Sequence, residues 1–209
     1  MNAIATEEER VMMLKVWWQK NRGWLISLVV VFVVGFFGYK YYSGEQLKRA
    51  EQASLLFTEF FGAYEASDME RANTLAAQLQ SDYKNTPYAN SVALFFAQEA
   101  VDSNDLAKAD QQLTWIVDNG AGFAKDLARA RLAQVKLAQQ QPDAALKLVN
   151  EISPGSYQPL FDDIKGDALV ALQRYSEARV AYVAALEAYR ALGFETHLLQ
   201  FKADALPQG

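Results

Sequence analysis

An uninterrupted apolar run near the N-terminus is the first clear pattern along the chain. It comprises the 17 uncharged residues 23–39 between Arg22 and Lys40. At about 1.5 Å per residue these cover about 25 Å, and two further tyrosines extend the run toward the ~30 Å hydrocarbon core of a bilayer. Aromatic residues, which favour the headgroup level, mark its two edges: Trp17, Trp18, Trp24, Tyr39, Tyr41 and Tyr42. The pattern predicts one transmembrane helix over 23–42, with the lipid bilayer as its partner.

Two other interpretations of this run are a cleaved signal peptide and a buried helix of a soluble domain. A signal peptide ends in small residues at a cleavage site, whereas bulky and charged residues follow this run at 40–45. A buried helix would not need basic and aromatic residues on both sides. We therefore expect an uncleaved anchor.

The segment before the anchor, 1–22, permits two interpretations. Val11, Leu14 and Trp18 recur at helical spacing while basic residues lie between them. This pattern fits a short amphipathic helix on the membrane surface, but it equally fits a polar leader. The sequence leaves both open.

The orientation of the anchor follows from charge and length. Four Lys or Arg residues precede the span within about 20 residues and three follow it, which slightly favours a cytoplasmic N-terminus. The 167 residues from Ser43 onward contain no second apolar run, and large domains are translocated largely regardless of charge. We predict a cytoplasmic N-terminus and a C-terminal domain on the far side of the membrane.

Apolar positions after Ser43 recur three and four residues apart, as in helices, and strand-like alternation is absent. Alanine, the strongest helix former, accounts for 31 of these 167 residues. The pattern predicts an all-α domain in which helices pack on helices.

Pairs of small residues twelve apart recur along this domain with successive spacings of 36 and 33 residues. The pairs are Ala97 with Ala109, Ala133 with Ala145, and Gly166 with Ala178. Small side chains allow the two helices of a hairpin to approach closely. The period is typical of tetratricopeptide repeats, which stack into a superhelix with a concave face.

The predicted domain organisation follows from this period. Three tetratricopeptide-like hairpins are expected over 87–193, and a capping helix and tail over 194–209. Residues 43–86 are expected to form a linking helix and a degenerate first hairpin, because Ala72 continues the period but Phe60 occupies its first small position. The alternative is an unspecialised antiparallel bundle.

The residue types needed for catalysis are sparse. The chain has no cysteine, one histidine (His197) and a net charge of −5, which exclude thiol chemistry and argue against nucleic-acid binding. Asp162, Asp163 and Asp167 are more typical of the acidic start of a helix than of a metal or acid–base site. Residues 120–122 lack the third glycine and the strand of a phosphate loop. We predict no catalytic, metal or cofactor site, no small-molecule substrate, and a non-enzymatic binding function.

The first helix of each hairpin lines the concave face of a tetratricopeptide stack. If the three hairpins follow the same register, the sequence predicts a groove that is lined by apolar, amide and acidic side chains. Its expected residues are Leu94, Gln98, Asp102, Ala130, Gln134, Leu137, Asp163, Asp167 and Val170. The groove lacks the clustered Lys and Arg that clamp a terminal carboxylate, and it suits low-specificity contact with extended or partly folded protein.

The whole layout resembles the YfgM-type ancillary subunits of the bacterial Sec translocon. The resemblance rests on the N-terminal block 9–23, the anchor edge Gly38-Tyr39-Lys40-Tyr41-Tyr42, the Thr86-Pro87-Tyr88-Ala89 stretch and the repeats. It implies a single-pass inner-membrane protein of a Gram-negative bacterium with its repeat domain in the periplasm. Such a protein associates with the SecYEG channel and with a membrane-anchored periplasmic chaperone of the prolyl-isomerase-like type. The resemblance further implies a role in passing secreted chains to periplasmic folding factors.

Two other hypotheses remain beside this one. The chain could be a membrane-anchored scaffold for another envelope complex, which a single dominant partner unrelated to secretion would favour. An enzyme would require an unrecognised carboxylate site, such as one at Asp163 and Asp167.

Overall fold

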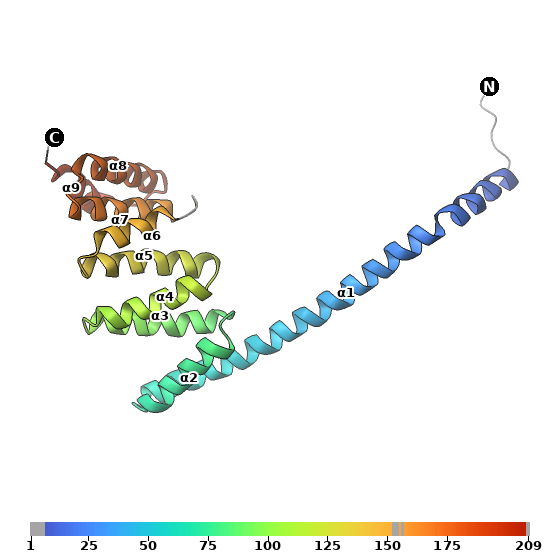
Figure 1. Ribbon diagram of the computed structural model, residues 1–209, viewed down its shortest axis with the longest axis horizontal. Coiled ribbons are helices and arrows are strands. Elements are labelled where there is room, and N and C mark those ends of the chain that lie inside the picture. Colours follow the sequence, from blue (N-terminus) through green and yellow to red (C-terminus); the bar gives the residue numbers. More distant parts are fainter. Residues whose placement is uncertain (1–6, 152–154, 156, 208–209) are drawn as a thin grey trace, which may run out of the picture. The chain divides into compact units, whose positions relative to one another are not determined.

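The computed structural model describes residues 7–151, 155 and 157–207, and this part of the chain is helical without a strand (Figure 1). Its helices are α1 (Glu7–Glu65), α2 (Met69–Asp82), α3 (Pro87–Asp102), α4 (Leu106–Asn119), α5 (Gly122–Ala138), α6 (Pro142–Asn150), α7 (Gln158–Ala171), α8 (Tyr175–Ala191) and α9 (His197–Asp204). The predicted all-α class is confirmed. Residues 1–6 of the expected N-terminal segment and 208–209 of the expected tail lie outside the described residues.

The chain divides into two compact units, 1–51 and 52–209. In the first unit, α1 carries the apolar run, and its large apolar side chains are exposed, from Val11 to Tyr42. The Ser27 hydroxyl donates to the Gly23 carbonyl at 3.0 Å, so this polar group is satisfied within the helix. Among the described residues, α1 is the one helix long and apolar enough to cross a membrane. An apolar surface of this size is stable in lipid rather than in water.

In the second unit, successive helices form antiparallel hairpins that stack on one another (Figure 1). The hairpins are the end of α1 with α2, α3 with α4, α5 with α6, and α7 with α8, and α9 packs against α8. Each hairpin also contacts the next one along the chain. The core is consequently divided into clusters along the stack, as expected when a single hairpin cannot bury its own apolar face.

The four hairpin turns share one backbone geometry. Each has a non-glycine residue in the left-handed region at φ of 58–61°: Ser67, Asn104, Gln140 and Gln173. The following N–H donates to the carbonyl five residues earlier, at 2.7–2.9 Å, which closes the preceding helix in a Schellman motif. The first hairpin therefore has the same turn as the other three, although Phe60 replaces the small residue of the repeat.

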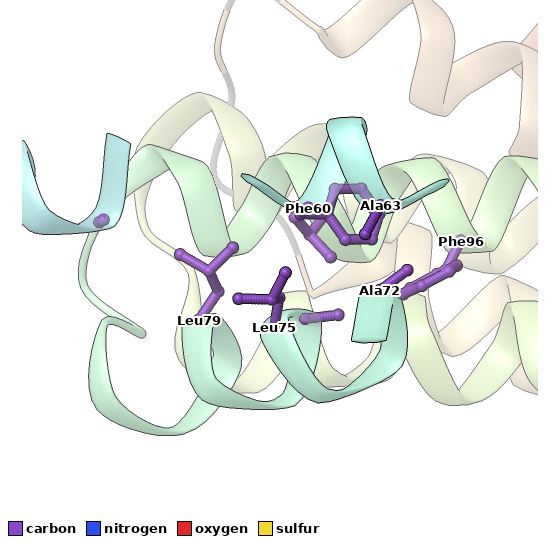
Figure 2. Close-up of a cluster of buried hydrophobic side chains, with 9 residues drawn as sticks. Phe60, Ala63, Ala72, Leu75, Leu79 and Phe96 are labelled. Carbon is purple, nitrogen blue, oxygen red and sulfur yellow. The ribbon is translucent and has the colours of Figure 1, made fainter. Parts of the chain in front are cut away.

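Phe60 explains how the first hairpin packs without that small residue. Its side chain is fully buried, and Figure 2 shows it next to Ala63 and in one cluster with Ala72, Leu75 and Leu79. Its ring meets the rings of Phe61, Phe95 and Phe96 edge to face, with centroids 5.0–5.7 Å apart. Aromatic packing between α1 and α3 thus replaces the close helix approach of the later hairpins.

The six small positions with the twelve-residue spacing are all buried at the helix contacts. Gly166 is the most constrained of them, because the Tyr182 ring of α8 lies directly on its backbone and a Cβ would overlap three ring carbons. The Tyr182 hydroxyl donates to Asp167 Oδ1 at 2.7 Å, which holds the ring in this place. Glycine is required here for close approach rather than for backbone freedom.

Candidate protein-binding groove

The first helices of the last three hairpins lie next to one another, since α3 contacts α5 and α5 contacts α7. This layer corresponds to the concave side of a tetratricopeptide stack. The nine residues predicted for the groove are distributed over it, three on each helix: Leu94, Gln98 and Asp102 on α3, Ala130, Gln134 and Leu137 on α5, and Asp163, Asp167 and Val170 on α7.

Three of these residues, Leu94, Gln98 and Gln134, line one pocket between α3, α4 and α5. The pocket has a volume of ≈160 Å³, and its lining is mostly apolar. Its other lining residues are Ala97, Val101, Leu106, Leu113, Arg131, Val135 and Ala138. The structure thus places a small apolar hollow at the N-terminal end of the predicted groove.

The rim of the pocket is polar and hydrogen-bonded across the two helices. Arg131 Nη1 of α5 donates to Gln98 Oε1 of α3 at 3.4 Å, and Gln98 Nε2 donates to Asp102 Oδ1 at 2.9 Å. Gln134 is exposed and forms no side-chain hydrogen bond within the part of the chain that the structure describes. Amide and guanidinium groups at this rim can bond both the carbonyl and the N–H groups of a bound backbone.

The remaining residues on α5 and α7 occupy other environments. Ala130 is 1% exposed and belongs to the cluster that holds Val149 and Phe161, so its side chain is not on the groove surface. Leu137 and Val170 are half-buried and pack against core clusters. The expected register on α5 was therefore right for Gln134 but wrong for Ala130, whose neighbour Arg131 lines the pocket instead.

Asp163 and Asp167 are engaged by the last helix. Lys202 Nζ of α9 lies 2.9 Å from Asp163 Oδ1 and 2.8 Å from Asp167 Oδ1, and Tyr182 bonds the same Asp167 oxygen. Burial raises the pKa of Asp163, although its hydrogen bond to Lys202 opposes this. Burial alone would lower the pKa of Lys202, but its bonds to the two carboxylates raise it above the ordinary value. The α9 helix therefore covers these carboxylates and neutralises part of their charge.

This part of the site was not expected from the sequence. Lys202 lies 39 residues from Asp163, and no local spacing links them. The apolar pattern of the last segment predicted a helix there but not the surface that it covers. Val101 of α3, Leu106 of α4 and Arg131 of α5 were also missed, since they line a pocket that forms only where these three helices pack together.

The residues predicted for the membrane interface lie on α1. Trp17, Trp18 and Trp24 are 52–66% exposed, and the tyrosines at 39, 41 and 42 are 64–76% exposed. Aromatic side chains that project from an unpartnered helix are suited to the headgroup level of a bilayer.

The described residues offer no constellation for catalysis. They contain no group of three or more His, Asp or Glu side chains that could hold a metal ion. His197 is exposed at the start of α9. The carboxylates at 163 and 167 are paired with Lys202 in partly buried salt bridges between α7 and α9.

Fold and groove together define a helical-repeat protein with a membrane anchor. A family model described as a tetratricopeptide repeat-like domain matches residues 15–208. The chain belongs to this tetratricopeptide repeat-like family. No solved structure matches the chain significantly.

Curated relatives match over nearly the full length of the chain. A protein of Neisseria gonorrhoeae (strain ATCC 700825 / FA 1090), named as an ancillary SecYEG translocon subunit, is 26% identical over 208 residues, covering 99% of this chain and 100% of the relative. Proteins with the same name from Escherichia coli (strain K12) and Aggregatibacter actinomycetemcomitans are 28% identical over 188 residues and 24% identical over 201 residues. They cover 90% and 96% of this chain, and 90% and 97% of their own lengths. The resemblance expected from the sequence is confirmed.

Proposed function

We propose that this protein is a non-enzymatic accessory subunit of the Sec translocon, anchored in the inner membrane with its repeat domain in the periplasm. The observation that carries the proposal is the similarity to ancillary SecYEG translocon subunits from end to end, including the anchor and the repeats. A similarity confined to the repeats would not support it, since helical repeats occur in many unrelated scaffolds.

The architecture supports a role in protein contact rather than in chemistry. An anchor beside the channel would keep the groove close to emerging chains and raise its effective concentration there. The repeat domain would bind SecYEG and a membrane-anchored periplasmic chaperone of the prolyl-isomerase-like type, and would help to pass secreted chains to periplasmic folding factors. The net charge of −5 and the apolar groove pocket are compatible with such contacts.

Photocrosslinking in native membranes tests this proposal. A photoreactive amino acid is introduced singly at exposed positions of the repeat domain, for example in place of Gln98 in the groove and Val180 on α8. We expect crosslinks to translocon subunits and to an envelope chaperone, at a subset of positions. If crosslinks to neither partner are recovered, the proposal is overturned. A single stoichiometric partner unrelated to secretion would instead identify the protein as a scaffold of another envelope complex.

A remaining enzymatic role is tested by substituting the one histidine and the paired carboxylates of α7. The substitutions His197→Ala and Asp163→Asn with Asp167→Asn should leave protein export unchanged wherever the protein still folds. Loss of export in a folded variant that keeps its crosslinks to the translocon would argue against a purely binding role.

A further inference from the structure

The pocket between α3, α4 and α5 has the size of a single apolar side chain. Its volume of ≈160 Å³ is close to the roughly 150 Å³ of a protein cavity that accommodates benzene. Leu94, Leu106, Leu113 and Val135 provide apolar walls, and Val101 is 42% exposed beside them. An aliphatic or aromatic side chain would remove this surface from water, which favours its binding.

The rim adds a charge preference. Arg131 is exposed and forms no ion pair with a carboxylate among the described residues; its one side-chain hydrogen bond is the 3.4 Å contact with Gln98. Gln98 on α3 and Gln134 on α5 both line the pocket. A guanidinium at the mouth of an apolar hollow favours an occupant that carries a carboxylate beside its apolar group.

The position of α9 limits where such an occupant can extend. Asp163 and Asp167 are paired with Lys202, so the α7 part of this layer is already covered by the chain's own last helix. The uncovered polar and apolar groups of the layer lie on α3 and α5. A bound segment would therefore be short and would centre on the pocket.

We propose that this pocket binds one Leu- or Phe-like side chain of an extended polypeptide, whose backbone bonds Gln98 and Gln134 and whose neighbouring acidic residue pairs with Arg131. This inference rests on the proposed function and specifies the substrate class of its groove. The occupant is an unfolded or extended protein segment with an apolar residue and, two positions later on the same side of the extended chain, Asp or Glu.

Fluorescence anisotropy on the full chain in lipid nanodiscs tests the inference. The probes are three fluorescein-labelled twelve-residue peptides in a Gly/Ser background: one with Leu-Gly-Glu at its centre, one with Ser in place of the Leu, and one with Gln in place of the Glu. We expect the Leu-to-Ser peptide to bind at least about tenfold more weakly, from the loss of a buried apolar side chain. The Glu-to-Gln peptide should bind about two- to fivefold more weakly, as for an exposed ion pair.

Matched substitutions locate the binding to this pocket. Ala138→Phe fills the pocket and should weaken the Leu-Gly-Glu peptide about tenfold, whereas Ala184→Phe on the exposed face of α8 should not change its binding. Arg131→Gln should make the Glu and Gln peptides bind equally. If Ala138→Phe impairs folding, judged by circular dichroism, Val101→Gln with the control Val180→Gln replaces this pair.

Three results would overturn the inference: no binding of the Leu-Gly-Glu peptide, equal binding of the Leu and Ser peptides, or unchanged binding to a folded pocket variant. The pocket variants are also tested for photocrosslinking to the translocon. Crosslinks that persist while the peptide results fail would refute only the pocket assignment. Absence of all translocon and chaperone crosslinks from photoreactive probes in the protein with an intact pocket would refute the proposed function itself.

Discussion

At the scale of single residues, the contact between Gly166 and Tyr182 offers a direct test of repeat packing. Gly166→Ala gains helix propensity, but the new methyl group overlaps a ring that is 2% exposed and bonded to Asp167. Overpacking of a filled core outweighs that gain, and we expect the free energy of unfolding to fall by about 1–3 kcal/mol. Urea denaturation followed by circular dichroism measures the change.

Gly62→Ala is the matched control for this residue, since open space surrounds a Cβ at that position. It should leave stability unchanged or raise it slightly, because Ala is the better helix former. Equal effects of the two substitutions would show that the Tyr182 ring moves aside freely and does not fix the approach of α7 to α8.

The six small packing positions could be located from the sequence because equal spacing is visible without any structure. The residues that line or cover the groove could not be located in this way. Asp163 was assigned to an open groove from its register, but Lys202 reaches it from a helix 39 residues later. Such a contact depends on the angle at which α9 returns across α7, and local periodicity carries no information on that angle.

At the scale of elements, the hairpin turns place non-glycine residues in the left-handed region. Gln173 has φ of 59° at the end of α7, a conformation that costs an L-residue about 1–2 kcal/mol and glycine little. Glycine also loses more backbone entropy on folding, which offsets part of this gain. We therefore expect Gln173→Gly to raise the free energy of unfolding by about 0.5–1 kcal/mol. Chemical denaturation measures the free energy of unfolding of both Gln173→Gly and Gln173→Ala.

The alanine variant serves as the control, because it removes the glutamine side chain but keeps the Cβ, and it should not stabilise. The same turn after α8 already contains glycine at Gly193, with φ of 80°. There the reverse substitution, Gly193→Ala, should lower stability by about 1 kcal/mol. Stabilisation by both Gln173 variants alike would attribute the effect to the side chain rather than to the backbone. The sequence located the hairpins but not the left-handed residue in each turn, since Ser and Gln do not mark such a residue as glycine does.

The contact of α9 with α7 and α8 should make stability depend on alkaline pH. Burial and the hydrogen bond to Asp167 raise the pKa of Tyr182, and the two carboxylates raise that of Lys202. A group with a raised folded-state pKa holds its proton more tightly when folded. Its contribution is complete below the unfolded pKa of about 10 and is lost as the pH rises further. We expect the free energy of unfolding to fall as the pH rises above about 10.

In urea denaturation at each pH, the free energy of unfolding of the double variant Tyr182→Phe with Lys202→Met should fall less steeply above about pH 10. Tyr175→Phe is the control on the same helix, since its hydroxyl forms no hydrogen bond with the described residues, and its decline should match that of the unsubstituted protein. An unchanged slope in the double variant would mean that the α9 contact contributes nothing to the alkaline response.

At the scale of the whole molecule, the orientation in the membrane decides whether the repeat domain can meet secreted chains. The charge difference across the anchor is only four against three, so the length of the C-terminal domain is the stronger argument for its translocation. The chain has no cysteine, and single cysteines can therefore report orientation without background labelling. Gln19→Cys before the anchor and Ser176→Cys on α8 place one exposed thiol on each side of it.

In intact spheroplasts, a membrane-impermeant maleimide should label the protein with Ser176→Cys, while Gln19→Cys should react only after the membrane is permeabilised. The reason is that the bilayer excludes the charged reagent from the cytoplasm, where we place the N-terminus. Labelling of Gln19→Cys alone would put the repeat domain in the cytoplasm, where it could not receive chains that leave the channel. Labelling of both thiols before permeabilisation would contradict a membrane-spanning anchor.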